Sequence, residues 1–121
     1  MPRSGKLRFA LGNLYESTQR RENARDVYQD ILKEFSGKPE ALDAQVKLAT
    51  MDWSSGKIEE AEQQLQTVLK ENPRSTEGLS LHGKIALQRG NGADAITDFR
   101  SVLKDQPERV EGYVLLARAH L

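Results

Sequence analysis

The chain has 121 residues, with 18 basic and 18 acidic side chains, no cysteine and a formal net charge of zero. This length fits one domain, and the lack of thiols excludes disulfide staples and thiolate metal sites. The balanced charge excludes a general electrostatic attraction to nucleic acid or to an anionic membrane surface. No stretch approaches the roughly 20 apolar residues that span a bilayer. We therefore expect a soluble protein without membrane insertion, in the cytoplasm or in a bacterial periplasm.

Apolar residues recur at helical spacing along the chain, as in Ile58, Ala61 and Leu65, and no segment alternates with the period of a strand. In chain order, the pattern predicts seven helices, over residues 5–18, 22–35, 39–54, 58–71, 75–89, 93–105 and 109–120. The first six should form three antiparallel pairs, with the seventh as half of a fourth pair. The predicted fold is all-α.

Two segments of the chain match each other at a fixed offset of 34 residues. Ala61 corresponds to Ala95, and Pro73 corresponds to Pro107. A period of this length is typical of stacked helical repeats, in which one unit cannot bury its apolar face alone. The predicted units span residues 5–41, 42–75 and 76–109, followed by a half unit over 110–121. We expect one domain over residues 1–121 that is part of a longer repeat array.

The units resemble the tetratricopeptide repeat family, whose pattern places small, aromatic and aliphatic residues and a proline at fixed positions. In the third unit these residues are Leu79, His82, Gly83, Ala86, Ala95, Phe99, Val102 and Pro107. The resemblance implies a right-handed superhelix of helix pairs that binds other proteins. The sequence departs from the pattern at Arg8 and Gln45, which replace a large apolar residue, and at Asp52, which replaces an aromatic one. The long first unit is similar to repeats of bacterial cell-envelope and secretion-associated members.

The first unit also differs from the others in its turns. Gly56 and Gly90 follow the first helices of their units, where a left-handed residue ends a helix, but Gln19 takes this position in the first unit. Keeping left-handed geometry at a non-glycine residue costs about 1 kcal/mol; otherwise the turn is looser. Ala24 lies 15 residues before Pro39, whereas Ala61 and Ala95 lie 12 residues before Pro73 and Pro107, so the first unit has three extra residues at this point. They lengthen either the second helix or the connection at residues 36–38, and both alternatives predict a local change of superhelical angle.

Small and large residues alternate across the predicted helix pairs. Small residues in both helices of a pair allow a close approach; they are Gly12, Ala49, Gly83, Ala117, Ala24, Ala61 and Ala95. The larger Tyr28, Leu65 and Phe99 are expected to fill the space between neighbouring units.

In such a stack the first helices line a concave groove. Side chains at the second, fifth, ninth and twelfth or thirteenth positions of a unit share the helical face that points into it. The predicted contacts with a partner peptide or helix are Phe9, Asn13, Val46, Thr50, Trp53, Lys84 and Arg118. The apolar side chains would serve as anchors, Asn13 would bond to main chain, and the two basic residues would meet an acidic group.

Two alternatives compete with this interpretation. Lys84 and Arg118 could pair with Glu77 and Glu111 along the helix faces instead of with a partner. Trp53, the only tryptophan, could cover a contact between units.

Catalysis receives no support from the sequence. His82 and His120 are expected to face the interior of the helix pairs as core histidines. No glycine-rich phosphate loop, set of metal ligands or activated nucleophile can be assembled. We predict a protein that is not an enzyme and that has no cofactor and no metal.

Self-assembly is the alternative function. Repeat stacks need polar terminal helices for solubility, but the last helix would expose an apolar strip, formed by Val110, Tyr113, Leu116, Ala117 and Leu121. This strip predicts a homodimer through the C-terminal helix.

Overall fold

The computed structural model describes residues 5–120, apart from the side chains of residues 110–112. The described residues form seven helices and no strand: α1 (Gly5–Ser17), α2 (Arg21–Glu34), α3 (Pro39–Ser54), α4 (Ile58–Glu71), α5 (Thr76–Gln88), α6 (Gly92–Asp105) and α7 (Val110–His120). Each helix begins and ends within one residue of its predicted bounds. The all-α helical solenoid is confirmed.

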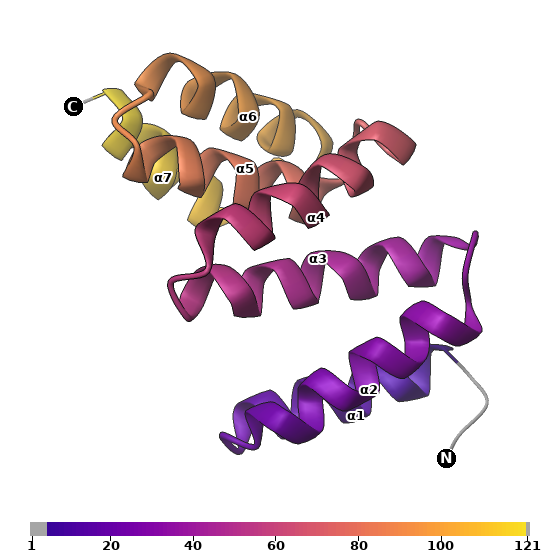
Figure 1. Cartoon of the computed structure of the whole chain (residues 1–121). Helices are drawn as coiled ribbons and strands as arrows, with labels where there is room; N and C mark the ends of the chain where they lie inside the picture. Colours follow the sequence, from indigo (N-terminus) through magenta and orange to yellow (C-terminus); the bar gives the residue numbers. More distant parts are fainter. Residues whose placement is uncertain (1–4, 121) are drawn as a thin grey trace.

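The helices are stacked in chain order, from α1 and α2 at one end to α6 and α7 at the other (Figure 1). Each helix packs against the next one in the chain, and α3 also contacts α5, which in turn contacts α7. The first helices of successive units therefore share one face of the stack, and their side chains form a common surface. The second helices α2, α4 and α6 form the opposite face.

The second helices each bury one stripe. In α2 the buried residues Ala24, Val27, Tyr28 and Ile31 follow the spacing of three and four that places side chains on one helical face. The core is divided into three successive clusters along the stack, centred on Tyr28, Leu65 and Phe99. This is the arrangement of a repeat protein, in which each unit buries its apolar stripe against its neighbours.

The three extra residues of the first unit lie at the start of α3, and neither of the two predicted places for them is right. Helices α2, α4 and α6 all have 14 residues, so the longer second helix is wrong. The connections that follow them, residues 35–38, 72–75 and 106–109, all have four residues, so the longer connection is wrong as well. Residues 36–38 precede Pro39, which is the first residue of α3 and needs no hydrogen bond there because it has no N–H. The corresponding Pro73 lies before α5, so α3 begins three residues earlier in its unit and has 16 residues, whereas α5 has 13. The change of superhelical angle at this junction stays a prediction.

The turn at Gln19 keeps the left-handed geometry of the glycine turns. Its φ is 62°, compared with 83° at Gly56 and 76° at Gly90. The Arg20 N–H donates to the Tyr15 carbonyl at 2.8 Å, and the equivalent bonds that close the two glycine turns have the same length. The alternative of a looser first turn is therefore wrong, and the strain of a left-handed glutamine is retained.

Two departures from the family pattern are balanced by polar partners. Arg8 is buried, forms an ion pair with Glu34 and has its guanidinium carbon 5.8 Å from the centroid of the Phe35 ring. Asp52 is also buried and accepts a hydrogen bond from Arg25 Nη2 at 3.1 Å. Buried charges are tolerated when they are paired in this way.

Candidate functional site

The first half of the concave groove lies between α1, α3 and α5, and has a volume of about 410 Å³. Val46 and Leu81 form an apolar floor and are buried, and Phe9 of α1 lies at its side. The lining residues are Phe9, Glu16, Asp43, Val46, Lys47, Thr50, Glu77, Ser80, Leu81 and Lys84. Three helices of three different units thus contribute to one continuous surface.

Negative charge prevails in this half, because its lining holds three carboxylates and two lysines. Glu77 accepts a hydrogen bond from Arg109 Nη1 at 2.9 Å. Asp43 has no ion pair in the part of the chain that the structure describes. Desolvation raises the pKa of the Asp43 carboxyl above its usual value, and the charges of Glu40 and Glu77 raise it further. A cation from outside the chain would relieve this repulsion.

The second half of the groove lies between α3, α5 and α7, and has a volume of about 570 Å³. Its lining residues are Trp53, Lys84, Leu87, Val114, Leu115 and Arg118. These described residues combine an indole ring, three aliphatic side chains and two cations, and none of them is a carboxylate. Lys84 lines both halves and therefore marks where they meet.

Six of the seven predicted contacts line this groove. Phe9, Val46 and Thr50 lie in the first half, Trp53 and Arg118 lie in the second, and Lys84 lies in both. Trp53 also packs against the core cluster between the second and third units, so it covers a contact between units. Its contact with a ligand stays a prediction.

Asn13 is the predicted contact that the groove lining does not include. Its side-chain Oδ1 lies 2.8 Å from the hydroxyl of Tyr28, which also lies 2.5 Å from Glu16 Oε1. Burial raises the pKa of Tyr28, and the hydrogen bond and charge of Glu16 raise it further. The protonated hydroxyl thus lies within hydrogen-bond distance of two side-chain oxygens of α1, and its one proton can be donated to either of them.

Glu77, one of the two acidic residues considered as internal partners, pairs with Arg109, just before α7. Lys84 also has a partner within the chain. The Glu111 side chain lies outside the described residues. No ion pair joins Arg118 to another side chain among those that the structure describes.

Sequence reasoning missed several lining residues that a stricter use of the repeat could have found. Glu16 and Leu87 occupy the same unit position as Trp53, one in the first unit and the other in the third. Lys47 and Leu81 follow the fifth position, which was expected to point into the groove. The helical face that lines the groove thus includes the sixth position of a unit in addition to the predicted positions.

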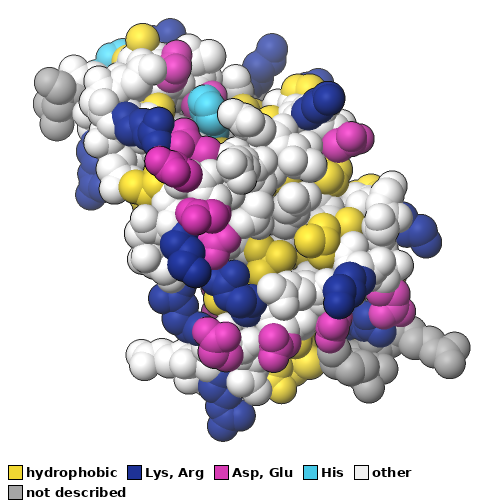
Figure 2. Space-filling model, in the orientation of Figure 1, with side chains coloured by type: hydrophobic (Ala, Val, Ile, Leu, Met, Phe, Trp, Pro, Cys, Tyr) yellow, Lys and Arg dark blue, Asp and Glu magenta, His cyan; other side chains and the backbone are white. Residues whose placement is uncertain are grey.

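The opposite face of the stack carries a second cleft, of about 490 Å³, between α4, α5 and α6. Leu65 and Ile85 form its buried floor, and an ion pair between Glu62 and Arg89, 2.5 Å long, crosses from α4 to the end of α5. On the side that Figure 2 shows, charged side chains of both signs are interspersed, and hydrophobic ones show between them. No single sign of charge prevails on this face.

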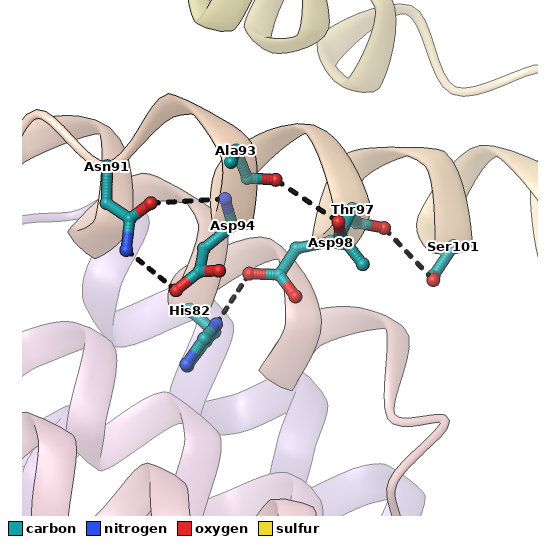
Figure 3. Close-up of polar contacts among 7 residues, drawn as sticks. All are labelled: His82, Asn91, Ala93, Asp94, Thr97, Asp98 and Ser101. Atoms are coloured by element: carbon teal, nitrogen blue, oxygen red, sulfur yellow. Dashed lines mark hydrogen bonds and ion pairs between the residues drawn. The ribbon is translucent and has the colours of Figure 1, made fainter.

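The histidines do not occupy the interior, and the expectation of core histidines is wrong. His82 and His120 are both exposed. His82 Nδ1 lies 2.5 Å from Oδ2 of the buried Asp98 on α6 (Figure 3). Desolvation raises the pKa of Asp98, the bond and charge of His82 lower it, and the charge of Asp94 raises it. The pair satisfies a carboxylate that the α5–α6 contact has desolvated.

Among the described residues, no three histidine or acidic side chains come together as metal ligands. None of the described helices is long and apolar enough to cross a membrane.

Models of the tetratricopeptide repeat match the sequence over residues 19–85 and 80–121, and the first match alone covers more than half of the chain. The chain belongs to the tetratricopeptide repeat family. No curated protein matches the sequence. Tetratricopeptide repeats are generally modules of protein–protein interaction and typically act as non-enzymatic scaffolds. The family thus gives the general role, and the partner has to be inferred from the groove.

Proposed function

We propose that this tetratricopeptide repeat protein binds a peptide or helix of a partner protein in the concave groove, without catalysis. The observation that supports this proposal is a groove that extends across α1, α3, α5 and α7, with apolar side chains on its floor and charged side chains at its rim. Apolar side chains in such a groove contribute affinity, and charges at the rim fix the orientation of the ligand. A continuous groove suits a ligand longer than a single side chain.

Site-specific photo-crosslinking tests which face binds the partner. A photoreactive amino acid is placed at Thr50, which lines the concave groove, or at Gln66, which lines the cleft on the opposite face. Lys104, which is exposed and lines neither, serves as the background control. The three proteins are irradiated in lysate of the native source, and cross-linked proteins are identified by mass spectrometry.

A protein that is cross-linked from Thr50, but not from Gln66 or Lys104, supports the concave groove. Its cross-linked peptide then gives the bound segment. Capture from Gln66 alone contradicts the proposal and assigns binding to the cleft between α4, α5 and α6.

Self-assembly through the terminal helix is a second candidate, because α7 exposes apolar side chains. Tyr113 is 53% exposed and Val114 is 48% exposed, while Leu116 is half-buried against the third core cluster. Val110 and Leu121, which belong to the same predicted strip, lie outside the described side chains. Sedimentation of the protein and of its Tyr113→Asp variant tests this candidate. A dimer that the substitution dissociates supports it, and a monomer at high concentration contradicts it.

A further inference from the structure

We propose that the half of the groove between α3, α5 and α7 binds an acidic side chain of the partner together with an adjacent bulky apolar side chain. This inference rests on the proposed function and names the chemistry of the ligand. The occupant is thus a segment of a partner protein in which a carboxylate neighbours an aromatic or large aliphatic residue.

Charge complementarity carries the acidic part of the proposal. The described lining residues of this half include the cations Lys84 and Arg118 and no carboxylate. Lys84 already has a partner within the chain, so Arg118 is the cation on which the proposal rests. Arg118 is exposed and forms no ion pair within the described residues. A carboxylate placed beside its guanidinium would form a charge-assisted, bidentate hydrogen bond, which is the geometry that arginine favours.

The apolar part follows from the remaining side chains of this half. Val114 is 48% exposed and lines this half together with the buried Leu115, so a bulky side chain would find aliphatic surface that the chain itself leaves open. The Trp53 Nε1–H donates to Gln88 Oε1 at 2.8 Å, which fixes the orientation of the indole ring. A held ring loses little conformational entropy when a ligand packs against it.

The first half of the groove repels the same ligand. Its described lining carries the carboxylates of Glu16, Asp43 and Glu77, and Asp43 forms no ion pair among the described residues. An acidic segment that slid toward α1 would therefore meet like charge, which is unfavourable. The two halves together place the acidic end of the partner over α5 and α7.

The test uses the intact chain and peptides selected from a random library displayed on phage. Selected peptides are synthesised with a fluorophore, and binding is measured by fluorescence anisotropy and by the emission of Trp53. We expect enrichment of sequences in which Asp or Glu neighbours an aromatic or large aliphatic residue. Because Trp53 is the only tryptophan, its emission should shift when such a peptide binds.

Arg118→Glu is the decisive variant, and Arg100→Glu, on an exposed position of α6, is its charge-matched control. Arg118→Glu should weaken binding about tenfold or more, the equivalent of 1.4 kcal/mol, while the control leaves it unchanged. A peptide in which lysine replaces the acidic residue should bind the Arg118→Glu variant better than the wild type. Circular dichroism of each variant establishes that helicity is retained.

The outcomes separate the inference from the proposed function. If Thr50→Trp abolishes binding of the selected peptides, the peptides bind in the groove. If these peptides lack acidic residues, or bind the Arg118→Glu variant as well as the wild type, the inference is overturned while groove binding stands. Peptides that neither Thr50→Trp nor Arg118→Glu affects overturn both, as does a selection that yields no binder.

Discussion

The ring of Phe99 occupies the space that a side chain at Gly83 would need. A Cβ atom built on Gly83 would lie 2.5 Å from Cε1 of the ring, closer than two carbon atoms can approach. The first unit repeats this relationship, with 2.6 Å from a Cβ on Gly12 to Cε1 of Tyr28. The rings therefore also pack within their own helix pairs, in addition to the expected contact between units.

The first prediction is that Gly83→Ala destabilises the protein although alanine is the better helix former. Phe99 is completely buried and cannot move aside, so overpacking should cost about 1 to 3 kcal/mol. This exceeds the gain of about 1 kcal/mol from helix propensity. The free energy of unfolding, measured by urea denaturation, should fall.

The second unit supplies the matched control for this prediction. There Ala49 takes the place of the glycine and Leu65 takes the place of the ring, and both are buried. Combining Gly83→Ala with Phe99→Leu recreates this pair, so the double variant should be more stable than the sum of the single effects predicts. A Gly83→Ala protein that is more stable than the wild type would contradict the proposed packing.

The second prediction concerns the strained turn. Gln19→Gly should raise the free energy of unfolding by up to about 1 kcal/mol, because glycine adopts a positive φ without the steric cost that glutamine bears. The φ of 62° at Gln19 and the retained hydrogen bonds of the turn are the basis of this expectation. Gly56→Gln is the reciprocal control and should destabilise by a similar amount. A lower melting temperature for Gln19→Gly would count against stored strain at this turn.

Helix bounds and groove residues could be predicted to different extents, for a physical reason. Helices follow from apolar spacing and from glycine and proline, which act within a few residues. The side chain that a polar residue reaches depends on the packed structure: Asn13 meets Tyr28, and His82 meets Asp98, across a helix pair. The repeat therefore predicted which helical face lines the groove, but not which of its members have partners inside the protein.

The buried Asp52 has hydrogen-bond partners on two other helices, and no local sequence pattern predicts them. Arg25 reaches its Oδ1 from α2 at 3.1 Å, and Gln64 reaches its Oδ2 from α4 at 2.5 Å. The third prediction is that Arg25→Ala costs about 1 to 3 kcal/mol, because it removes a charged donor from a buried carboxylate. Thermal unfolding measures this loss.

The control for the third prediction is Arg100→Ala, which removes an exposed arginine and should change stability by less than about 0.5 kcal/mol. Replacing Arg25 by Met and Asp52 by Leu together should cost less than the single changes add up to, since neither charge is then left alone. Equal effects of Arg25→Ala and Arg100→Ala would show that the pair contributes nothing to the junction of the first two units.

The fourth prediction is that Asp43→Asn stabilises the free protein at neutral pH. Desolvation, and then the charges of Glu40 and Glu77, raise the pKa of Asp43 in the folded state. The folded protein therefore binds a proton at Asp43 more tightly than the unfolded chain does. The contribution of the Asp43 carboxyl to the stability of the wild type is fully present below the pKa that Asp43 has in the unfolded chain. It is lost as the pH rises through the pKa of Asp43 in the folded state. The gain should be less than about 1 kcal/mol, because solvent screens an exposed groove.

The pH dependence distinguishes this charge effect from a change in packing. The stability difference between Asp43→Asn and the wild type should be largest at pH 7 and should vanish as the pH falls below about 4, where both side chains are neutral. Salt at about 1 M should reduce it, because the repulsion from Glu40 and Glu77 is screened. Asp30→Asn, on an exposed position of α2, is the control and should show neither trend. If the stability difference between Asp43→Asn and the wild type does not change with pH, the asparagine acts through its contacts and not through the loss of charge. Asp43 would then not be a site of electrostatic repulsion in the groove.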